Sequence, residues 1–312
     1  MGVMLALLMP PAAAQAEDPT PAAVTCDGGT PAACSRTRVA PPAEPGAPGP
    51  RRSAATLPTG TNFWELQLNL CNSGIASCYT RYNNGQAVGE AAGVIRAQWP
   101  DLVTLNEICE ADVMETLFAT MREIWPGDWV YSGFMPAYDR GRNAPYLCAN
   151  GDEYGIGILG HVPAPLYEEV RVFGDVYPDS HEGSPTQDTG SSEKRAWLCA
   201  YAVGNSYGCT THLASSSGSI AANQCRYLMS GIVPGLWSSQ GATKPSVMGG
   251  DLNLRFRGWP DAQACVPPGW FRKGDGDVQH VMATNDFAFD FTRKIDLRRT
   301  DHDAWLVALV TR

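Results

Sequence analysis

Short stretches of alternating apolar and polar residues make up much of this chain, and two longer stretches repeat at helical spacing. Residues 63–71 alternate with period two, which predicts a strand. Apolar residues recur at helical spacing from Ala87 to Trp99, where Pro100 ends the predicted helix, and residues 111–125 predict a second amphipathic helix. The remaining predicted strands lie within residues 101–107, 154–160, 194–204, 207–215, 244–253, 277–284 and 303–310. Many short strands with two or three helices predict an α/β (α+β) fold, in which two sheets pack together and helices cover them.

The first 60 residues differ in composition from the rest. Residues 1–16 combine a short apolar run with small residues around Ala14 and Ala16, which predicts a signal peptide and a secreted, extracellular protein. Prolines interrupt that run, and it is shorter than the roughly 20 residues of a membrane-spanning helix. Residues 17–60 are dominated by Ala, Pro, Thr and Gly, so we expect a disordered leader. One compact domain then covers residues 61–312.

The ten cysteines contain no paired CxxC knuckles of a zinc site. An even number of cysteines in an exported protein favours disulfides, although sequence alone does not fix their connectivity. Pairing of sequence neighbours predicts the disulfides Cys26–Cys34, Cys71–Cys78, Cys109–Cys148, Cys199–Cys209 and Cys225–Cys265.

Polar residues stand at the ends of several predicted strands. They are Glu107, His212, Asp251 with Asn253, and Asp301 with His302. Strand ends converge at one rim of a sheet sandwich, so we expect these side chains to meet. Carboxylate and amide oxygens are the ligands that Mg²⁺ and Ca²⁺ prefer, and imidazoles transfer protons near neutral pH. The set predicts metal-assisted hydrolysis of a phosphodiester.

Taken alone, each of these residues also has an ordinary structural interpretation. An Asp-x-Asn sequence after two glycines is more often a turn or a cap. Glu107 fits the negative charge at the start of the following helix, and His212 fits a structural histidine. Arg195 fits either a phosphate contact or a surface strand position, because arginine forks suit phosphate. His161 and His181 have no matching motif, and we assign them no role.

Five motifs occur in a fixed order along the chain: "LQLNLCNSG", "LVTLNEIC", "CTTHLAS", "GGDLNLR" and "TDHDAWLV". Each is weak alone, but the ordered set, with every motif at a predicted strand end, is specific. The set resembles the endonuclease/exonuclease/phosphatase superfamily, whose founding shape is that of pancreatic deoxyribonuclease. The resemblance runs from about Gln67 to Val307 and implies a four-layer α/β sandwich, with two packed mixed β-sheets flanked by helices.

The resemblance implies a role for each matching residue. Asn69, Glu107 and Asp301 would hold or support a divalent ion, Mg²⁺ with Mn²⁺ or Ca²⁺ as alternatives. The catalytic residues would be His212 as acid or phosphate contact, Asp251 on the attacking water, Asn253 on a phosphate oxygen and His302 beside the water or the phosphorane.

One position departs from the family pattern. The family has an aspartate in a strand before the final histidine, where it orients that histidine, and the gapless counterpart "VQHVMAT" places Gln279 there. A neutral amide accepts the imidazole N–H but cannot stabilise an imidazolium as a carboxylate does. Asp296 lies too close to Asp301 for an intervening strand and turn, whereas Asp277 and His280 remain nearby alternatives. Gln279 is therefore our expected partner of His302.

The substrate is harder to predict than the reaction. The formal net charge of −9 argues against a passive basic surface for nucleic acid, although a nuclease that must release its product need not be basic. We expect a monomer without a stable protein partner that acts on nucleic acid, with DNA ahead of RNA. Phe134, Met135 and Tyr138 could form an interfacial loop, so a sphingomyelinase-like lipid phosphodiesterase acting on a lipid headgroup is the alternative. Gln279 motivates a third hypothesis, a catalytically weakened homologue that binds a partner.

Overall fold

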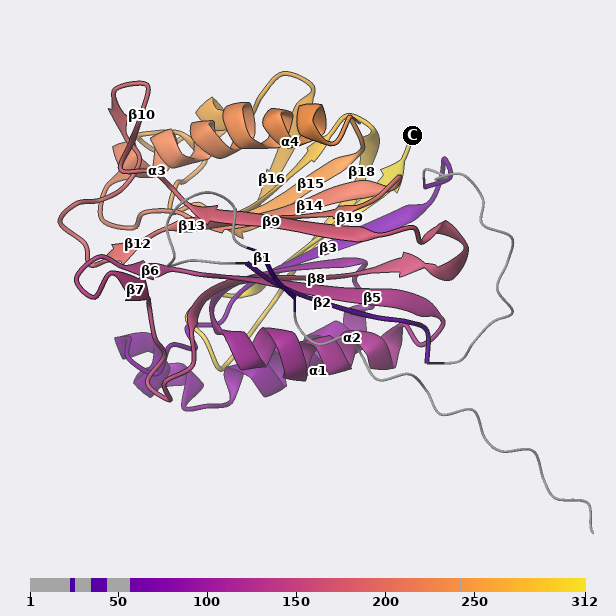
Figure 1. Cartoon of the computed structure of the whole chain (residues 1–312), viewed down its shortest axis with the longest axis horizontal. Helices are drawn as coiled ribbons and strands as arrows, with labels where there is room; N and C mark the ends of the chain where they lie inside the picture. Colours follow the sequence, from indigo (N-terminus) through magenta and orange to yellow (C-terminus); the bar gives the residue numbers. More distant parts are fainter. Residues whose placement is uncertain (1–22, 26–34, 44–56, 242) are drawn as a thin grey trace, which may run out of the picture.

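Two packed β-sheets form the centre of the protein, and helices cover both outer faces (Figure 1). The computed structural model describes residues 23–25, 35–43, 57–241 and 243–312. Both large sheets are mixed, because each contains one parallel pair of strands among antiparallel ones. The predicted four-layer α/β sandwich is therefore confirmed.

The larger sheet has eight strands in the order β1-β2-β5-β8-β4-β3-β19-β18. Only β3 and β4 pair in parallel among the described strands of this sheet. Their bounds are β1 (Ala23–Thr25), β2 (Ser35–Ala40), β5 (Asp128–Pro136), β8 (Tyr154–Pro163), β4 (Leu102–Cys109), β3 (Asn62–Asn69), β19 (Ala304–Thr311) and β18 (Phe287–Ile295).

The second sheet has six strands in the order β16-β17-β15-β14-β13-β9, with β14 and β15 in parallel. Their bounds are β16 (Trp270–Gly274), β17 (Gln279–Thr284), β15 (Ser246–Asp251), β14 (Ser206–His212), β13 (Ala196–Ala202) and β9 (Val170–Val176). Short strands form two small sheets: β6 (Tyr138–Asp139), β7 (Ala144–Pro145) and β12 (Glu193–Lys194) in one, and β10 (Ser180–His181) and β11 (Ser184–Pro185) in the other.

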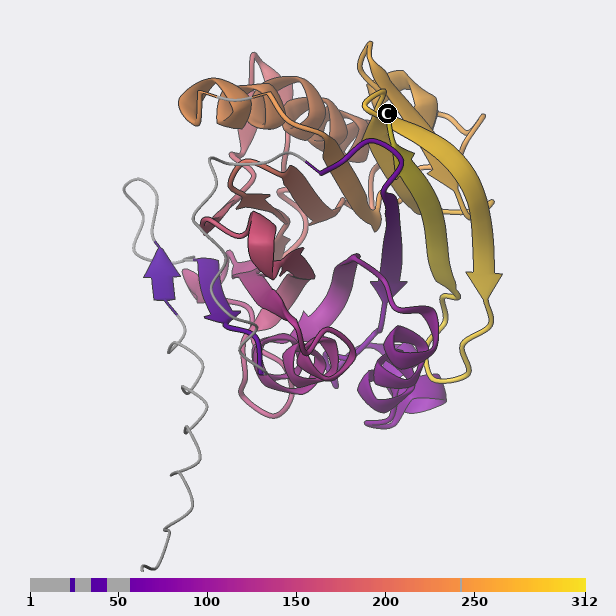
Figure 2. The same cartoon turned by 90° about the vertical axis from the view of Figure 1, so that its right-hand side faces the viewer.

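Each sheet carries its own helical layer, and Figure 2 shows the two layers on opposite sides of the strands. The first layer contains α1 (Ala87–Gln98), the π-helical turn η2 (Asp112–Leu117) and α2 (Phe118–Ile124). The second contains α3 (Gly218–Arg226), the π-helical turn η4 (Tyr227–Ile232) and α4 (Val233–Ser239). Shorter helical turns are η1 (Tyr79–Asn83), η3 (Ala164–Leu166) and η5 (Ala262–Cys265). No helix in the described ranges is both long and apolar enough to cross a membrane.

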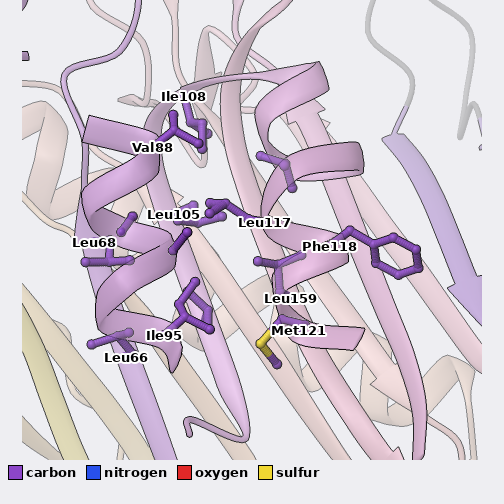
Figure 3. Packing of buried hydrophobic residues seen from close by; sticks show 14 of the residues in the cluster. Leu66, Leu68, Val88, Ile95, Leu105, Ile108, Leu117, Phe118, Met121 and Leu159 are labelled. Atoms are coloured by element: carbon purple, nitrogen blue, oxygen red, sulfur yellow. The ribbon is translucent and has the colours of Figure 1, made fainter. Parts of the chain in front are cut away.

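The alternation in β3 has a clear structural cause. Leu66 and Leu68 point toward α1 and pack with Ile95 from that helix, as Figure 3 shows. The intervening polar residues of β3 point the other way, toward the second sheet, and are also buried. Both faces of the strand are therefore covered, one by apolar contacts and the other by a polar network described below.

The N-terminal part of the chain differs from our expectation of a disordered leader over residues 17–60. Two strands of the larger sheet, β1 and β2, lie within that range, so the expectation is wrong for residues 23–25 and 35–40. The composition offers few large apolar residues to hold this segment. The strand β2 is held instead by backbone hydrogen bonds with β5 and by ion pairs of Arg36 with Glu110 and Glu153. The signal peptide and the exact start of the domain stay predictions.

Four of the five predicted disulfides are present: Cys71–Cys78, Cys109–Cys148, Cys199–Cys209 and Cys225–Cys265. These four disulfides confirm the prediction that each of these eight cysteines pairs with its neighbour in the sequence. Cys26 and Cys34 lie outside the described residues. The four disulfides are compatible with folding in an oxidising compartment.

The predicted interfacial loop around Phe134 is wrong. Phe134 and Met135 lie in β5 with 0% exposure, and Tyr138 is 9% exposed in β6. The sequence "YSGFMP" forms a central strand covered on both faces, so these apolar side chains fill the core and cannot contact a lipid surface.

Candidate active site

The carboxyl ends of the two parallel strand pairs meet, and this meeting point positions most of the predicted site. In the larger sheet Asn69, the last residue of β3, lies opposite Asn106 of β4. In the second sheet His212, the last residue of β14, lies opposite Asp251, the last residue of β15. Asp251 is also aligned with Gln279 at the start of β17. The strands that contain four of the sequence motifs therefore end next to one another at this point.

Asn69 connects the two sheets at this point. Its Nδ2 donates to Glu107 Oε1 at 3.2 Å and to Asp251 Oδ2 at 3.0 Å. Its Oδ1 accepts a hydrogen bond from the Cys71 backbone N–H at 3.2 Å, which fixes which end of the amide faces the carboxylates. Asn69 therefore holds two carboxylates from different sheets in a set position.

The backbone of Glu107 has an unusual conformation. Its φ is +53°, in the left-handed region, and the pairing of β4 with β8 shifts register between Leu105 and Ile108. A bulge of this kind redirects a side chain out of the normal alternation of a strand. The Asn72 N–H donates to the Glu107 carbonyl at 2.8 Å. The disulfide Cys71–Cys78 lies beside its carboxylate, and the disulfide of Cys109 lies two residues further on, so this turn is fixed from both sides.

The surroundings of Glu107 disfavour the charged form of its carboxyl group. Burial raises its pKa to about 7, the Asn69 amide and Arg195 oppose that shift, and the negative charges of Asp251 and Glu193 add to it. A carboxylate that burial and like charges disfavour is stabilised by a bound divalent cation. The raised pKa of Glu107 thus reflects burial first and the neighbouring carboxylates second.

His212 is held by an arginine. Arg195 Nη1 donates to His212 Nδ1 at 2.7 Å, and the same nitrogen lies 3.0 Å from Glu193 Oε1. His212 Nε2 then faces Glu107, with Oε1 at 3.8 Å. Burial, the Arg195 charge and His302 lower the pKa of His212 well below its usual range. The imidazole is therefore neutral, and because Nδ1 accepts from Arg195, its proton is on Nε2.

Asp251 and His302 face each other across the site. Asp251 is 2% exposed, and its Oδ2 lies 3.7 Å from His302 Nε2. The same nitrogen of His302 lies 3.9 Å from Asp301 Oδ1. Asp251 Oδ1 accepts the Asn253 N–H at 2.9 Å. The Asp251 carboxylate is therefore oriented by neighbours on both oxygens.

Asn253 and Gln279 lie at this site with side-chain contacts to backbone carbonyls. Asn253 has a φ of +49° and donates from Nδ2 to the Leu213 carbonyl at 2.9 Å. Gln279 is fully buried and donates from Nε2 to the Asp303 carbonyl at 2.6 Å, one residue beyond His302. Its Oε1 has no hydrogen-bond partner among the described residues. Gln279 thus positions the segment that carries His302, while its role toward the imidazole and that of Asn253 toward phosphate stay predictions.

A buried polar chain below the site was not predicted from the sequence. Thr104 Oγ1 contacts both Glu65 and Gln67, Gln67 Nε2 donates to Asn106 Oδ1 at 2.6 Å, and Asn106 Oδ1 also accepts the Asp251 N–H at 2.7 Å. All four side chains are 0% exposed. This series of hydrogen-bonded side chains runs from the space between the sheets to the backbone N–H of Asp251.

The two glycines before Asp251 make room for this arrangement. A Cβ on Gly249 would lie 2.1 Å from Glu65 Oε1 and 2.2 Å from Thr104 Oγ1. A Cβ on Gly250 would lie 2.4 Å from the Thr211 carbonyl of the neighbouring strand. Gly249 therefore leaves space for the polar chain, and Gly250 lets β14 and β15 approach closely just before the site.

The donor set suits a hard divalent cation. Glu107 and Asp251 both contact the Asn69 amide, and Asp301 approaches through His302 Nε2 at 3.9 Å, although in the described ranges these three carboxylates are not all within 4.8 Å of one another. Carboxylate and amide oxygens are the ligands that Mg²⁺, Mn²⁺ or Ca²⁺ prefer. The sulfurs of Cys71 and Cys78 also lie within 4.8 Å of a Glu107 oxygen, but they are joined in a disulfide, and a disulfide is no thiolate ligand. The predicted ion fits oxygen ligands and not a zinc–thiolate site.

Solved structures share this architecture over most of the chain. An endonuclease/exonuclease/phosphatase family protein from Bacteroides thetaiotaomicron matches with a TM-score of 0.54 at 14% identity, over 81% of this chain and 99% of that one. The chain has the endonuclease/exonuclease/phosphatase fold.

Two more proteins with this fold are similar. ANGEL2, a 2′,3′-cyclic phosphatase, has a TM-score of 0.55 at 11% identity over 81% of this chain and 96% of its own. A Bacteroides thetaiotaomicron mannosyl-6-phosphatase has a TM-score of 0.51 at 14% identity, over 80% of this chain and 99% of its own. No protein-family model matches the sequence, and no curated protein matches it. The resemblance to the endonuclease/exonuclease/phosphatase superfamily is confirmed at the level of the fold.

Proposed function

We propose that this protein is a divalent-metal-dependent phosphodiester hydrolase, and specifically a secreted DNase-like endonuclease. The observation that carries the proposal is the convergence of two histidines and two acidic residues from four separate motifs around the Asn69 amide. They are Glu107, His212, Asp251 and His302. A catalytic constellation is recognised by such mutual geometry, and the fold alone does not supply it.

Different residues act on the ion, on the attacking water and on the phosphate. Glu107 and Asp301, with Asn69 in support, would hold the ion, which when bound neutralises negative charge that develops on the phosphate. Asp251 orients the attacking water and accepts its proton, with the His302 imidazole 3.7 Å away to share the charge. Neutral His212 donates its Nε2 proton as a hydrogen bond to a phosphate oxygen or to the leaving group.

The remaining residues position these groups. Arg195 fixes the tautomer of His212 through the 2.7 Å contact with Nδ1. A direct phosphate contact by Arg195 is also proposed, since its Nη2 reaches toward the exposed side, where Ser215 Oγ lies at 3.4 Å. Asn253 holds a phosphate oxygen. Gln279 holds the Asp303 carbonyl and through it the loop of His302.

Nucleic acid is our proposed substrate, with DNA ahead of RNA. Disulfides compatible with export support it, and the lipid alternative has lost its motivation because Phe134 and Met135 are buried. ANGEL2 is a cyclic phosphatase bound to an adenosine derivative, whereas another protein of the same fold is a mannosyl-6-phosphatase. Since the fold hosts both, the substrate has to be decided by experiment.

Nicking of supercoiled plasmid tests the proposal. We expect activity with Mg²⁺ or Mn²⁺, with Ca²⁺ compared in parallel, and complete loss with a chelator. His302→Ala should lower the rate about 100-fold or more, because it removes a group that shares proton transfer. His181→Ala is the matched control, since His181 lies in β10 with 44% of its side chain exposed.

Two outcomes would contradict the proposal. Release of phosphocholine from sphingomyelin without plasmid nicking would select the lipid phosphodiesterase. An intact fold that hydrolyses neither substrate with any of the three ions would select the binding homologue.

A further inference from the structure

The loop directly after the candidate active site exposes two aromatic side chains. Trp259 is 100% exposed and Phe256 is 50% exposed, in the sequence "RFRGWP". We call residues 255–260 the Arg-Trp loop. Single exposed apolar residues are common on proteins, but two aromatic rings within four positions add no stability to the core and indicate a contact surface.

Arginines surround these rings. The guanidinium of Arg257 lies 5.2 Å from the centre of the Phe256 ring, and that of Arg272 from β16 lies 4.6 Å from it. Arg255 is 66% exposed and forms an ion pair with Asp277, while Asp261 accepts the Arg257 N–H. Residues 255–260 themselves carry two arginines and no acidic residue, in a protein of net charge −9.

The Arg-Trp loop is continuous with the candidate active site. It follows Asn253, whose amide is fixed to the Leu213 carbonyl. Asp277, the partner of Arg255, lines a surface cavity that Asp301 and His302 also line. At its other end Pro260 packs against Gly218 at the start of α3, where an added Cβ would lie 2.8 Å from the proline ring. The loop is thus anchored at both ends with its aromatic tip exposed.

We propose that the Arg-Trp loop binds an unpaired nucleotide of a single-stranded polynucleotide beside the scissile phosphodiester. Trp259 stacks on the base, and Arg255 and Arg257 contact the neighbouring phosphates. Bases have exposed faces only where the strand is unpaired, whereas a duplex already stacks them on each other. This inference rests on the proposed function and adds to it a preference for single strands or frayed ends.

The same features disfavour a membrane as the occupant. A loop that inserts into a bilayer needs a continuous apolar tip, yet Arg257 separates Phe256 from Trp259, and two guanidiniums cover the Phe256 ring. Arginine beside an aromatic ring instead matches the pattern of nucleic-acid surfaces, where guanidinium groups contact phosphate and rings stack on bases.

Fluorescence anisotropy with a labelled oligothymidylate tests this inference. The His302→Ala protein in Mg²⁺ serves as the reference, so that the probe stays intact. Adding Trp259→Ala should raise the Kd for the single strand about tenfold, as expected for one lost base-stacking contact. Trp259→Phe should restore most of the affinity. A blunt duplex and an abasic oligomer of equal length should bind equally to the reference and the Trp259→Ala protein.

Trp99→Ala is the matched control, because Trp99 is 51% exposed and follows α1 just before the start of β4, away from the carboxyl end that forms the site. An unchanged Kd for the single strand in Trp259→Ala would overturn the inference. So would binding to phosphatidylglycerol vesicles that Trp259→Ala abolishes while oligothymidylate binding stays unchanged. Neither result touches the proposed function, which fails only if the wild-type protein hydrolyses no phosphodiester in the plasmid assay.

Discussion

Asp251→Asn is expected to lower kcat for plasmid nicking about 10⁴-fold, because it removes both the proton acceptor for the attacking water and a negative charge beside the ion. The substitution keeps the size of the side chain. However, one of the two Asp251 oxygens accepts the Asn253 N–H and the other accepts Asn69 Nδ2. An amide NH₂ at either position would face a donor, so the water, Asn69 and Asn253 would all lose their orientation.

Initial rates with plasmid and with bis(p-nitrophenyl) phosphate measure this effect, and urea unfolding shows whether the variant is folded. Asp290→Asn makes the same change of charge at an exposed position of β18 and should leave the rate unchanged. A folded Asp251→Asn protein that retains wild-type rates on both substrates would remove Asp251 from the mechanism.

Glu65 is expected to make the folded protein less stable as the pH rises from about 4.5 to 8. Burial raises the pKa of Glu65 from 4.5 to about 8, and the hydrogen bond from Thr104 opposes that shift. The folded protein therefore keeps a proton that the unfolded chain loses above pH 4.5. The free energy of unfolding should fall through this window and level off above it, by up to about 5 kcal/mol at 1.36 kcal/mol per pKa unit.

Glu65→Gln should remove this pH dependence. Glutamine keeps the length of the side chain and an acceptor for Thr104 but cannot ionise. We expect the urea midpoint of the variant to exceed that of the wild-type protein at pH 8, and the difference to shrink toward pH 5. Glu182→Gln is the control, since its side chain is 86% exposed. Parallel midpoint curves for wild type and Glu65→Gln would show that Glu65 is ionised in the folded state.

Periodicity predicted the elements whose two faces differ strongly. Residues 63–71 and 87–99 predicted β3 and α1 well, because a leucine face on one meets an apolar face on the other. The same rule missed β18, where Asp290, Arg293 and Lys294 stand on an exposed strand with a bulge. It also missed the helical segment of α3 and α4, in which a glycine and a proline interrupt the pattern.

The sequence predicted the site residues that stand at strand ends. It did not predict the contacts that these residues make with side chains from distant parts of the chain. Asp251 and His212 follow from their own motifs, and the structure aligns them on neighbouring parallel strands. The contact of Arg195 with His212 joins residues 17 positions apart, one between β12 and β13 and the other at the end of β14, so no local pattern marks it. Glu65 and Thr104 were visible as polar residues at alternate strand positions, but alternation does not reveal that the polar face meets a second sheet.

The strand β2 has a consequence for how this protein should be handled. It occupies the hydrogen-bonding edge of β5, and among the described strands only the three-residue β1 continues the sheet beyond it. A protein shortened to begin at residue 57 would open the edge of β5 along residues 130–134, which now pair with β2, and expose N–H and C=O groups there. Open edges of this length recruit strands from other molecules, so the trimmed protein should self-associate. We therefore expect β2 to protect the protein against aggregation.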